Sequence, residues 1–275
     1  MGLYASRMPL PAPSPDARAV VTGASQGIGE ALATELAARG YNLIITARRE
    51  DVLTEVATRL TAKYRITVEV RPVDLADAAE RVKLADELAG RNISILCANA
   101  GIATIGPVSS LDPAGERALV QLNAVAAHDL TLAVLPGMIE RGAGGILISG
   151  STAGNSPIPN NATYASTKAF LNTFSESLRG ELLTSGVHVT LLAPGPVRTG
   201  MLESVDESAA NKLAPDFVWV SAEYTAKVSL DGLSRNKMRV VPGLPAKVMS
   251  VANQYLPRAL VAPIVGRAYK KLGGG

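Results

Sequence analysis

The feature of this sequence that most constrains its fold is the regular alternation of short apolar runs with segments of helical spacing. Apolar runs typical of buried strands lie at residues 19–22, 42–46, 67–70, 93–98, 145–149, 187–193 and 238–241. Segments in which apolar residues recur at helical intervals lie between them, at residues 28–39, 51–63, 77–89, 113–141, 163–184 and 221–233. Successive strand–helix–strand units connect parallel strands through right-handed crossovers. The sequence therefore predicts an α/β fold, a single doubly wound parallel sheet of about seven strands with helices on both faces.

Composition divides the chain into three parts. Residues 1–18 are rich in proline and are expected to form an extended N-terminal arm. Residues 19–241 carry the alternating pattern without an internal repeat or a Gly/Ser-rich linker, which favours one domain. Residues 242–275 form a tail, and from Gly232 onward the chain has eight basic and no acidic side chains.

The basic tail mixes its charges with aliphatic residues, as segments that lie on membranes do. Pro257 and Pro263 break it into short pieces, so one long amphipathic helix is not expected. Contact with anionic lipid headgroups is one interpretation, and packing on the domain or on a partner subunit is the other; the sequence favours neither. Aromatic residues that stack on bases do not alternate with the charges, apart from Tyr255 and Tyr269, so nucleic acid is not expected as a partner.

Residue counts argue against several other classes. No apolar run approaches the roughly 20 residues needed to span a bilayer. The single cysteine, Cys97, lies in an apolar strand, which favours a packed, inert thiol and a reducing, cytoplasmic setting. If the basic tail contacts lipid, the protein is expected at the inner face of the plasma membrane. His128 and His188 have no companions at metal-ligand spacing, so no metal site is expected.

A glycine-rich turn follows the first strand and opens the first helix. Glycine lets the backbone turn tightly and lets a pyrophosphate approach the free N–H groups at the helix N-terminus. A glycine triplet is weak evidence alone, but its position between a strand and a helix is the context that dinucleotide binding requires. The candidate cofactor-binding residues of this turn are Gly23, Ser25, Gln26, Gly27, Ile28 and Gly29.

The end of the second strand bears on the choice of dinucleotide. Sites that prefer NAD place Asp or Glu there to bind the ribose hydroxyls. This chain has Arg48 and Arg49 instead of an acid. Because a guanidinium binds a phosphate through two parallel hydrogen bonds, Arg48 predicts NADPH as the cofactor. The alternative is that both arginines merely begin a solvated helix.

A candidate catalytic pair lies in the fifth helical segment. Tyr164 and Lys168 stand four residues apart and therefore share one helix face. A lysine ammonium beside a tyrosine favours the phenolate and lowers the tyrosine pKa, which allows proton transfer near neutral pH. Ser151 lies thirteen residues before Tyr164, at the end of a strand, where it can meet the tyrosine across a cleft. On this spacing alone a chance pair in an amphipathic helix is the better interpretation, and the other motifs have to decide.

Taken together, the motifs resemble those of the short-chain dehydrogenase/reductase family from Ala19 to Val241. The glycine-rich turn is similar to TGxxxGxG, and Pro194–Thr199 is similar to the PGxVxT turn that seats the nicotinamide. Asn99–Gly101 matches the NAG after the fourth strand, although Ala98 replaces the asparagine usual before it. The resemblance implies that residues 19–241 form a catalytic domain with a Rossmann-type sheet of order 3-2-1-4-5-6-7.

The resemblance also implies roles for single residues. The positions of the family's catalytic tetrad are occupied by Asn123, Ser151, Tyr164 and Lys168. The further cofactor-binding residues that it implies are Asp74, Leu75, Asn99, Ala100, Gly101, Tyr164, Lys168, Pro194, Gly195, Val197 and Thr199. Tyr164 is expected to donate the proton, and Ser151 to hydrogen-bond the carbonyl oxygen. Lys168 is expected to bind the ribose as well, and Asn123 to hold a water that links Lys168 to solvent.

Three functional classes stay open from the sequence. The first is NADPH-dependent reduction of the β-keto group of a long-chain lipid, for which the apolar residues between Gly200 and Val220, such as Met201 and Phe217, suit a lid. The second is the same chemistry on another apolar ketone or alcohol, such as a steroid or an acyl thioester. The third is a non-catalytic NADP-binding module. We expect a homodimer or homotetramer, because the family usually pairs through its long crossover helices.

Overall fold

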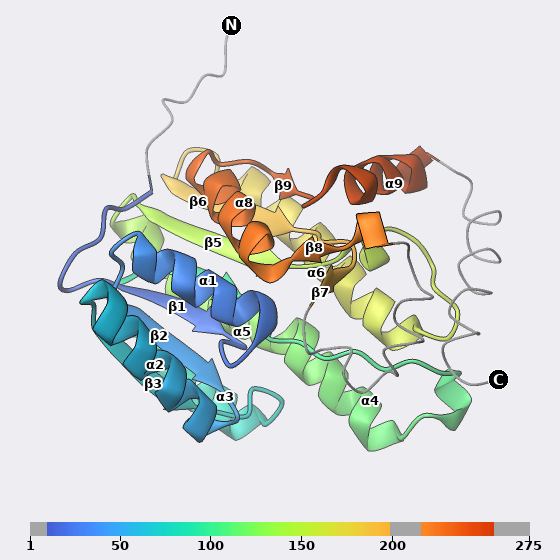
Figure 1. Cartoon of the computed structure of the whole chain (residues 1–275), viewed down its shortest axis with the longest axis horizontal. Coiled ribbons are helices and arrows are strands. Elements are labelled where there is room, and N and C mark those ends of the chain that lie inside the picture. The colour runs from blue at the N-terminus through green and yellow to red at the C-terminus, as the bar shows by residue number, and fades with distance from the viewer. Residues whose placement is uncertain (1–9, 199–215, 256–275) are drawn as a thin grey trace, which may run out of the picture.

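Seven parallel strands form the central sheet, in the order β3-β2-β1-β4-β5-β6-β9 (Figure 1). The computed structural model describes residues 10–198 and 216–255, and of Met249 and residues 251–255 the backbone alone. The strands are β1 (Arg18–Thr22), β2 (Leu43–Ala47), β3 (Val68–Pro72), β4 (Ile93–Ala98), β5 (Gly144–Ser149), β6 (Val187–Leu192) and β9 (Arg239–Val240). The predicted doubly wound Rossmann-type sheet and its strand order are confirmed.

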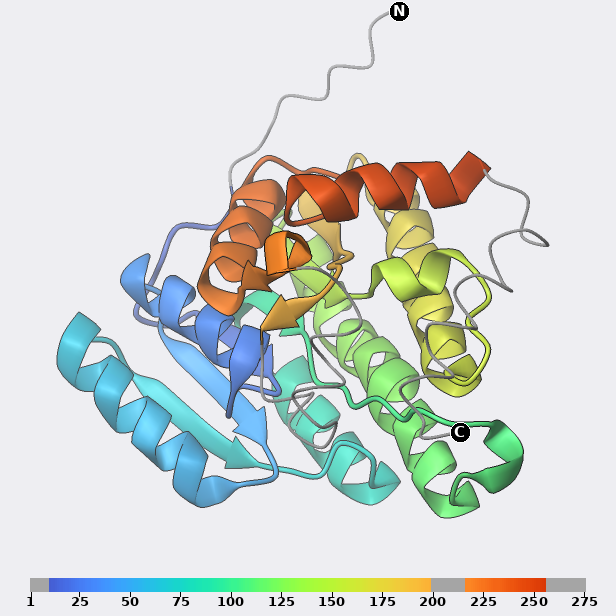
Figure 2. The same ribbon diagram turned by 45° about the vertical axis from the view of Figure 1, so that its right-hand side comes forward.

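Helices cover both faces of the sheet (Figures 1 and 2). One face carries α1 (Gly27–Ala38), α2 (Glu50–Tyr64) and α8 (Ala222–Ser234). The other carries α3 (Ala78–Ala89), α5 (Ala126–Glu140) and α6 (Ala162–Glu181). The remaining elements are η1 (Val108–Ser110), α4 (Pro113–Val120), η2 (Gln121–Val125), η3 (Thr152–Asn155), β7 (Val197–Arg198), η5 (Asp216–Val218), β8 (Val220–Ser221) and α9 (Leu244–Tyr255). The long elements agree closely with the segments that the apolar spacing predicted.

Alternate side chains of the strands enter two separate cores, as strands covered by helices on both faces require. In β1, Ala19 and Val21 pack in the core under α1 and α8, whereas Val20 packs in the core under α3 and α5. In β4, Cys97 packs in the first of these cores and Leu96 in the second. Cys97 is fully buried, and burial raises the pKa of its thiol to about 12, so the thiol is inert as expected.

The region predicted as one helix over residues 113–141 consists of three segments. The π-helical segment η2 separates α4 from α5 and contains Asn123. A π-turn widens the helix locally and is frequent at functional sites. The apolar spacing of the sequence carries no signal for this change of pitch.

Among the described residues, one helical region is long enough and apolar enough on average to cross a membrane, although it contains no unbroken apolar run of that length. Residues Pro113–Glu140 meet the criterion for a membrane-spanning helix by length and composition alone, with a mean hydropathy of 1.5 over an 18-residue window. In the structure α5 packs against α3 and β4. A core helix of a globular protein meets the same criterion, so this region is weak evidence for a membrane span.

The described part of the N-terminal arm lies along the domain. Leu10 packs against the core under α1. The Tyr41 hydroxyl donates a hydrogen bond of 2.7 Å to the Pro11 carbonyl, and the Asn42 side chain donates one of 3.3 Å to the Ser14 carbonyl. Residues 10–14 are therefore fixed by the loop that precedes β2.

The described part of the basic tail also packs on the domain. Helix α9 contacts η3 and η5. It buries Ala246 and Ser250, which are 4% and 3% exposed. Of the two interpretations of the tail, residues 244–255 fit packing on the domain.

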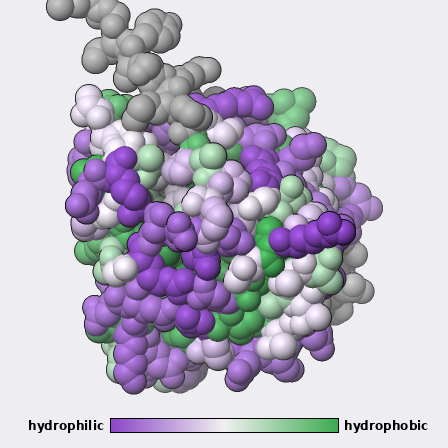
Figure 3. Space-filling view, turned by 90° about the vertical axis from the view of Figure 1, so that its left-hand side faces the viewer, coloured by the Kyte–Doolittle hydropathy of each residue, from purple (hydrophilic) through white to green (hydrophobic). Residues whose placement is uncertain are grey.

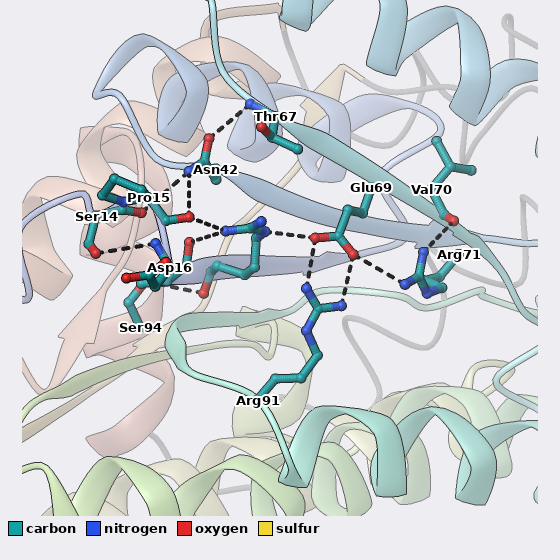
Figure 4. A network of polar contacts seen from close by, with 12 residues as sticks. Ser14, Pro15, Asp16, Asn42, Thr67, Glu69, Val70, Arg71, Arg91 and Ser94 are labelled. Carbon is teal, nitrogen blue, oxygen red and sulfur yellow. Dashed lines mark hydrogen bonds and ion pairs between the residues drawn. The ribbon is translucent and has the colours of Figure 1, made fainter.

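The edge of the sheet at which the strands begin carries a network of charged side chains under a mostly hydrophilic surface (Figure 3). Glu69 of β3 accepts hydrogen bonds of 2.7 Å from both Arg18 and Arg91, and Arg71 also contacts it (Figure 4). Hydrogen bonding to Arg91, followed by that to Arg18, lowers the pKa of the Glu69 carboxyl to about 2. The network joins the first and third strands through their side chains.

We expect Glu69→Gln to lower the free energy of unfolding at pH 7 by about 1 to 2 kcal/mol, because it weakens charge-assisted bonds to two guanidinium groups. A carboxyl whose pKa falls on folding stabilises the protein above its unfolded pKa, near 4.5, and this contribution is lost as the pH falls toward 2. Urea unfolding at a series of pH values between 7 and 3 measures both quantities, and the variant should show the flatter acid dependence.

The matched control is Glu30→Gln. Glu30 forms an ion pair with Arg59 in which the two side chains are more exposed, at 36% and 50%. This variant should change the free energy of unfolding by less than about 0.5 kcal/mol. Equal losses in the two variants would contradict a special role for the network around Glu69.

Candidate active site

The glycine-rich turn between β1 and α1 has the backbone conformation expected from its sequence. Gly23 and Gly27 have φ angles of 68° and 60°, in the left-handed region that favours glycine. A Cβ on Gly23 would lie 2.9 Å from the Cα of Ala100, and a Cβ on Gly29 would overlap the Gly23 carbonyl. The turn therefore lies directly against the chain after β4. With the amides of the α1 N-terminus beside it, this backbone fits a pyrophosphate.

Ser25, Gln26 and Ile28 complete the turn. The Gln26 side-chain oxygen accepts a hydrogen bond of 2.7 Å from Arg49, and Ile28 packs against the core. Arg49 was not assigned to the site from the sequence, where an arginine next to Arg48 was its only signal. Arg48 is exposed and has no hydrogen bond or ion pair to any other described residue. Both neighbouring arginines are exposed, and of the two only Arg49 has a hydrogen-bond partner among the described residues.

Asp74 and Leu75 follow β3 at the same edge of the sheet. The Asp74 carboxylate accepts a hydrogen bond of 3.0 Å from the amide of Ala76. The carbonyl of buried Leu75 accepts one of 2.9 Å from Arg81, whose guanidinium also binds Asp129 of α5 at 2.8 Å. These bonds hold the turn against α3 and α5 and leave Asp74 half-buried.

Asn99 joins the carboxyl ends of three strands. Its backbone amide donates to Thr22 Oγ1 at 2.9 Å, and its side-chain amide donates to the Thr22 carbonyl at 3.2 Å. Its side-chain oxygen accepts a hydrogen bond of 3.0 Å from the Ser149 hydroxyl. A Cβ on Gly101 would lie 3.1 Å from Asn123 Oδ1. The Asn99–Gly101 segment thus connects the glycine turn to a predicted catalytic residue.

Asn123 is fully buried in the π-helical segment η2. Its Oδ1 accepts a hydrogen bond from the Ile102 amide and its Nδ2 donates one to the Ile102 carbonyl, both at 2.9 Å. Nδ2 also donates to Thr167 Oγ1 on α6 at 3.3 Å. One side chain therefore joins η2 to the loop after β4 and to the helix that carries Tyr164.

Helix α6 holds Tyr164 and Lys168 one turn apart. The Lys168 ammonium lies 5.6 Å from the centroid of the Tyr164 ring and donates a hydrogen bond of 2.8 Å to the Ser149 carbonyl. Lys168 is 5% exposed, and burial lowers the pKa of its ammonium to about 8. The structure thus brings the predicted pair together beside the end of β5.

Ser151 follows β5 and precedes the short helix η3. Its Oγ accepts a hydrogen bond of 3.0 Å from the amide of Ala153 and donates a long one of 3.5 Å to the Pro194 carbonyl. Ser151 is 8% exposed. Its hydroxyl therefore lies between η3 and the turn after β6.

The turn after β6 contains the predicted nicotinamide residues. The Pro194 carbonyl accepts a hydrogen bond of 3.0 Å from the Thr152 amide, which holds the turn against η3. Gly195 lies in this turn, and Val197 begins β7, which pairs with β8. Thr199, the last predicted residue of this motif, lies outside the described residues.

The apolar lid expected between residues 200 and 220 is described only from Asp216 onward. Phe217 is 73% exposed, whereas Val218 is 7% exposed. Met201 and Leu202 belong to the part of the chain that is not described.

Both histidines contact groups other than a metal ligand set. His128 lies edge-on to Phe170 and tilted against Phe174, and His188 Nδ1 lies 2.9 Å from the Leu233 carbonyl. Within residues 10–198 and 216–255, no group of three His, Cys, Asp or Glu side chains is arranged to hold a metal ion.

Comparison with known proteins identifies the family. The family described as short chain dehydrogenase matches residues 17–210, and the chain belongs to it: it is an oxidoreductase that acts on CH–OH and C=O groups. Sulfoacetaldehyde reductase 2 of Chromohalobacter salexigens is 35% identical over 81% of this chain and 93% of its own length. Very-long-chain 3-oxoacyl-CoA reductase of Bos taurus is 34% identical over 76% of this chain and 68% of its own length. A short-chain dehydrogenase from Sphingobium yanoikuyae, solved in complex with NADPH, has a TM-score of 0.79 and 29% identity, covering 89% of this chain and 94% of that one.

We expect Arg48→Ala to raise the Kd for NADPH by about 10- to 100-fold and to leave the Kd for NADH nearly unchanged, because the exposed Arg48 guanidinium, which no other described residue binds, would pair with a 2′-phosphate. Arg49→Ala should change the ratio of the two constants less, since Arg49 is engaged with Gln26. Fluorescence titration of the wild type and both variants with each dinucleotide measures these constants without a substrate. If the ratio of the Kd values for NADPH and NADH is unchanged in Arg48→Ala, Arg48 does not bind the 2′-phosphate. If the ratio changes more in Arg49→Ala, Arg49 has that role.

Proposed function

We propose that this chain is an NADPH-dependent ketoreductase that reduces the β-keto group of a long-chain lipid to a hydroxyl. The observation that carries the proposal is the Lys168 ammonium, which lies 5.6 Å from the Tyr164 ring and is linked through Ser149 and Asn99 to the turn that fits a dinucleotide. NADPH is favoured because the first two residues after β2 are arginines and not an acid, and because a similar solved structure contains NADPH. Reduction agrees with the relatives, which are named as reductases.

The residues that would hold the dinucleotide lie along the carboxyl edge of the sheet. The glycine turn would bind the pyrophosphate, Arg48 the 2′-phosphate and Asp74 the adenine. Lys168 would bind the ribose hydroxyls, and the turn with Pro194 would contact the nicotinamide. When bound, the reduced nicotinamide supplies the hydride that adds to the carbonyl carbon.

The side chains of this chain would handle the proton and the developing charge. As the carbonyl carbon is reduced, negative charge grows on its oxygen, where hydrogen bonds from Ser151 and Tyr164 would stabilise it. Tyr164 would transfer its proton to this oxygen, and the Lys168 ammonium favours the phenolate that remains. Asn123 Oδ1 has a second lone pair that can accept a hydrogen bond from a water near Lys168, through which the proton would be replaced.

A long acyl chain is the substrate class that fits best. One relative is named as a reductase of very-long-chain 3-oxoacyl-CoA, in which a β-keto group stands on a long chain. In sequence, residues 11–18 and 261–267, outside the shared motifs, resemble the mycobacterial reductase of 3-oxo-mycolates. We therefore propose the conversion of a 3-oxo-mycolate to the mature mycolate, a step in making mycolic acids for the cell wall. Another apolar ketone, such as a steroid or a short acyl thioester, is the alternative.

A cytoplasmic site at the inner face of the plasma membrane would suit such a substrate. On α9, Leu244 and Val248 are 74% and 61% exposed and lie one turn apart, with exposed Lys247 between them. Apolar and cationic side chains on one helix favour contact with anionic lipid. The basic residues beyond Tyr255 would add to that attraction. The basic/apolar tail of residues 242–275 is thus proposed as a membrane-contacting part beside the domain of residues 19–241.

A homodimer or homotetramer is proposed from the surface of the two long helices after β4 and β5. Leu132 and Ile139 of α5 are 52% and 45% exposed, and Phe170 of α6 is 45% exposed. Large apolar side chains at the surface favour association with a second copy. The molecular mass in solution tests this directly.

Tyr164→Phe should lower kcat for a long-chain 3-oxoacyl thioester by about 100-fold or more, because the general acid is lost. The Kd for NADPH should stay near the wild-type value. Stopped-flow absorbance of NADPH and fluorescence titration measure the two quantities. If the variant retains turnover, the assignment of Tyr164 as the proton donor is wrong.

The substrate class is tested with the same assay on chains of different kinds. We expect kcat/KM to rise with the length of a 3-oxoacyl chain and to be at least about 10-fold lower for a steroid ketone and for sulfoacetaldehyde. A preference for either of the last two contradicts the lipid assignment. Lipid profiling of cells that lack the protein then identifies the accumulated keto-lipid, for which 3-oxo-mycolate is the expected result.

Membrane contact is tested with a double substitution, Leu244→Asp with Val248→Asp. It should reduce the fraction that sediments with phosphatidylglycerol vesicles by about fivefold or more, because it removes apolar contact and adds repulsion. Leu183→Asp, at a residue that is 53% exposed, is the matched control. Equal sedimentation of all three proteins, or no sedimentation of the wild type, rules out the proposed contact.

A further inference from the structure

A continuous chain of hydrogen bonds runs from Ser151 to the C-terminal helix α9, through Asn172, Asn155 and Ser250. We propose that Asn172 is a positioning residue for Ser151 and that α9 supports it through Asn155 and Ser250. The inference rests on the proposed function, in which the Ser151 hydroxyl binds the reacting carbonyl oxygen. It gives the C-terminal helix a part in catalysis.

The Asn172 side chain holds both backbone groups of Ser151. Its Oδ1 accepts a hydrogen bond of 3.3 Å from the Ser151 amide, and its Nδ2 donates one of 2.9 Å to the Ser151 carbonyl. Asn172 is 4% exposed, so these bonds lie in a region of low dielectric where they are strong. Fixing the amide and the carbonyl of one residue fixes both flanking peptide planes, and thereby the direction in which its side chain leaves the backbone.

Two glycines allow this contact. A Cβ on Gly150 would overlap the Asn172 amide oxygen, and a Cβ on Gly154 would lie 2.5 Å from the carbonyl carbon of Lys168. Because neither residue has a side chain, η3 packs directly on α6. Ser151 is therefore positioned by the same helix that carries Tyr164. This shared support fixes the distance and the orientation between the two hydroxyl groups.

Asn155 connects this arrangement to the C-terminal part of the chain. Its Oδ1 accepts hydrogen bonds from Asn172 at 3.1 Å and from Arg239 at 3.2 Å, and its Nδ2 donates to Ser250 Oγ at 3.0 Å. Arg239 is itself held by an ion pair of 2.8 Å with Glu176 of α6. Ser250 is 3% exposed, so α9 meets the site with a buried polar contact.

Helix α9 also backs the neighbouring turn. A Cβ on Gly195 would lie 2.7 Å from the Cβ of Ala246, so the turn after β6 lies against α9 without a side chain between them. The Pro194 carbonyl of that turn is 3.5 Å from Ser151 Oγ. Helix α9 thus supports both segments that enclose the Ser151 hydroxyl.

A double-mutant cycle on the full-length protein tests the positioning role. With NADPH and a long-chain 3-oxoacyl thioester, Asn172→Ala should lower kcat by about 10- to 100-fold and leave the Kd for NADPH within about twofold. In a Ser151→Ala background the same substitution should cost less than about twofold, because it acts through the Ser151 hydroxyl. If the factors by which the two substitutions lower kcat simply multiply in the double variant, the proposal is overturned. An unchanged kcat in Asn172→Ala would also overturn it.

Further variants separate positioning from a general loss of structure. Asn172→Asp keeps the size of the side chain and removes both donated bonds, so it should lower kcat even where Asn172→Ala does not fold. Ser250→Ala should lower kcat by a smaller factor, about two- to fivefold. The control is Ser175→Ala, at a buried position on the same helix whose hydroxyl has no hydrogen-bond partner among the residues that the structure describes, and it should keep the wild-type kcat. Wild-type kcat in both Asn172→Asp and Ser250→Ala overturns the proposal.

Amide hydrogen exchange provides a readout that does not depend on the reaction. In the absence of dinucleotide, Asn172→Asp and Ser250→Ala should speed exchange in the peptide that covers residues 150–156, and Ser175→Ala should not. Wild-type turnover in Ser151→Ala, together with faster exchange in the first two variants, means that the proposed function has failed while the linkage holds. Unchanged exchange in all three variants means that the linkage itself is wrong.

Discussion

A buried ammonium group is the constraint on which the rest of the candidate site depends. Removing a charged lysine from water costs free energy unless a hydrogen-bond acceptor replaces the water. Lys168 has that acceptor in the carbonyl of Ser149, the last residue of β5. The Ser149 hydroxyl binds Asn99, and Asn99 binds Thr22 at the end of β1. A series of bonds therefore runs from the lysine to the glycine turn across the ends of three strands.

The two edges of the sheet have different chemistry, and each difference has a physical consequence. At the edge where the strands begin, Glu69 lies among arginines in a partly exposed network that contributes to stability. At the opposite edge, most of the bonds join uncharged groups, and the buried charged side chains Lys168 and Arg81 each donate to a backbone carbonyl. Low dielectric strengthens each of these bonds, so small displacements at this edge are costly. The proposed reaction needs that rigidity, since Ser151 and Tyr164 must meet the same oxygen atom.

Much of the site was predictable because its residues occupy fixed places in a parallel α/β fold. Tyr164 and Lys168 share a helix face by their spacing alone, and Gly23 follows a strand and precedes a helix. The hydrogen bonds from Arg49 to Gln26 and from Asn172 to Ser151 were not predicted, because each depends on the direction of one side chain toward a segment that is distant in sequence. The π-helical turn around Asn123 was missed for a related reason: its side chain pairs with Ile102 in a loop that is far away in sequence.

The sequence by itself determined the layered fold, because apolar spacing and strand–helix alternation are local properties that right-handed crossovers convert into a doubly wound parallel sheet. The order of the strands was implied by the resemblance of its motifs to those of the short-chain dehydrogenase/reductase family. The sequence also determined which residue types stand at the ends of the strands. Only the tertiary structure decided that Lys168 is buried against Ser149, that Arg49 and not Arg48 is hydrogen-bonded within the described part of the chain, and that α9 lies behind Ser151. Those outcomes depend on contacts between segments up to about a hundred residues apart, such as Asn155 with Ser250, which no local pattern encodes.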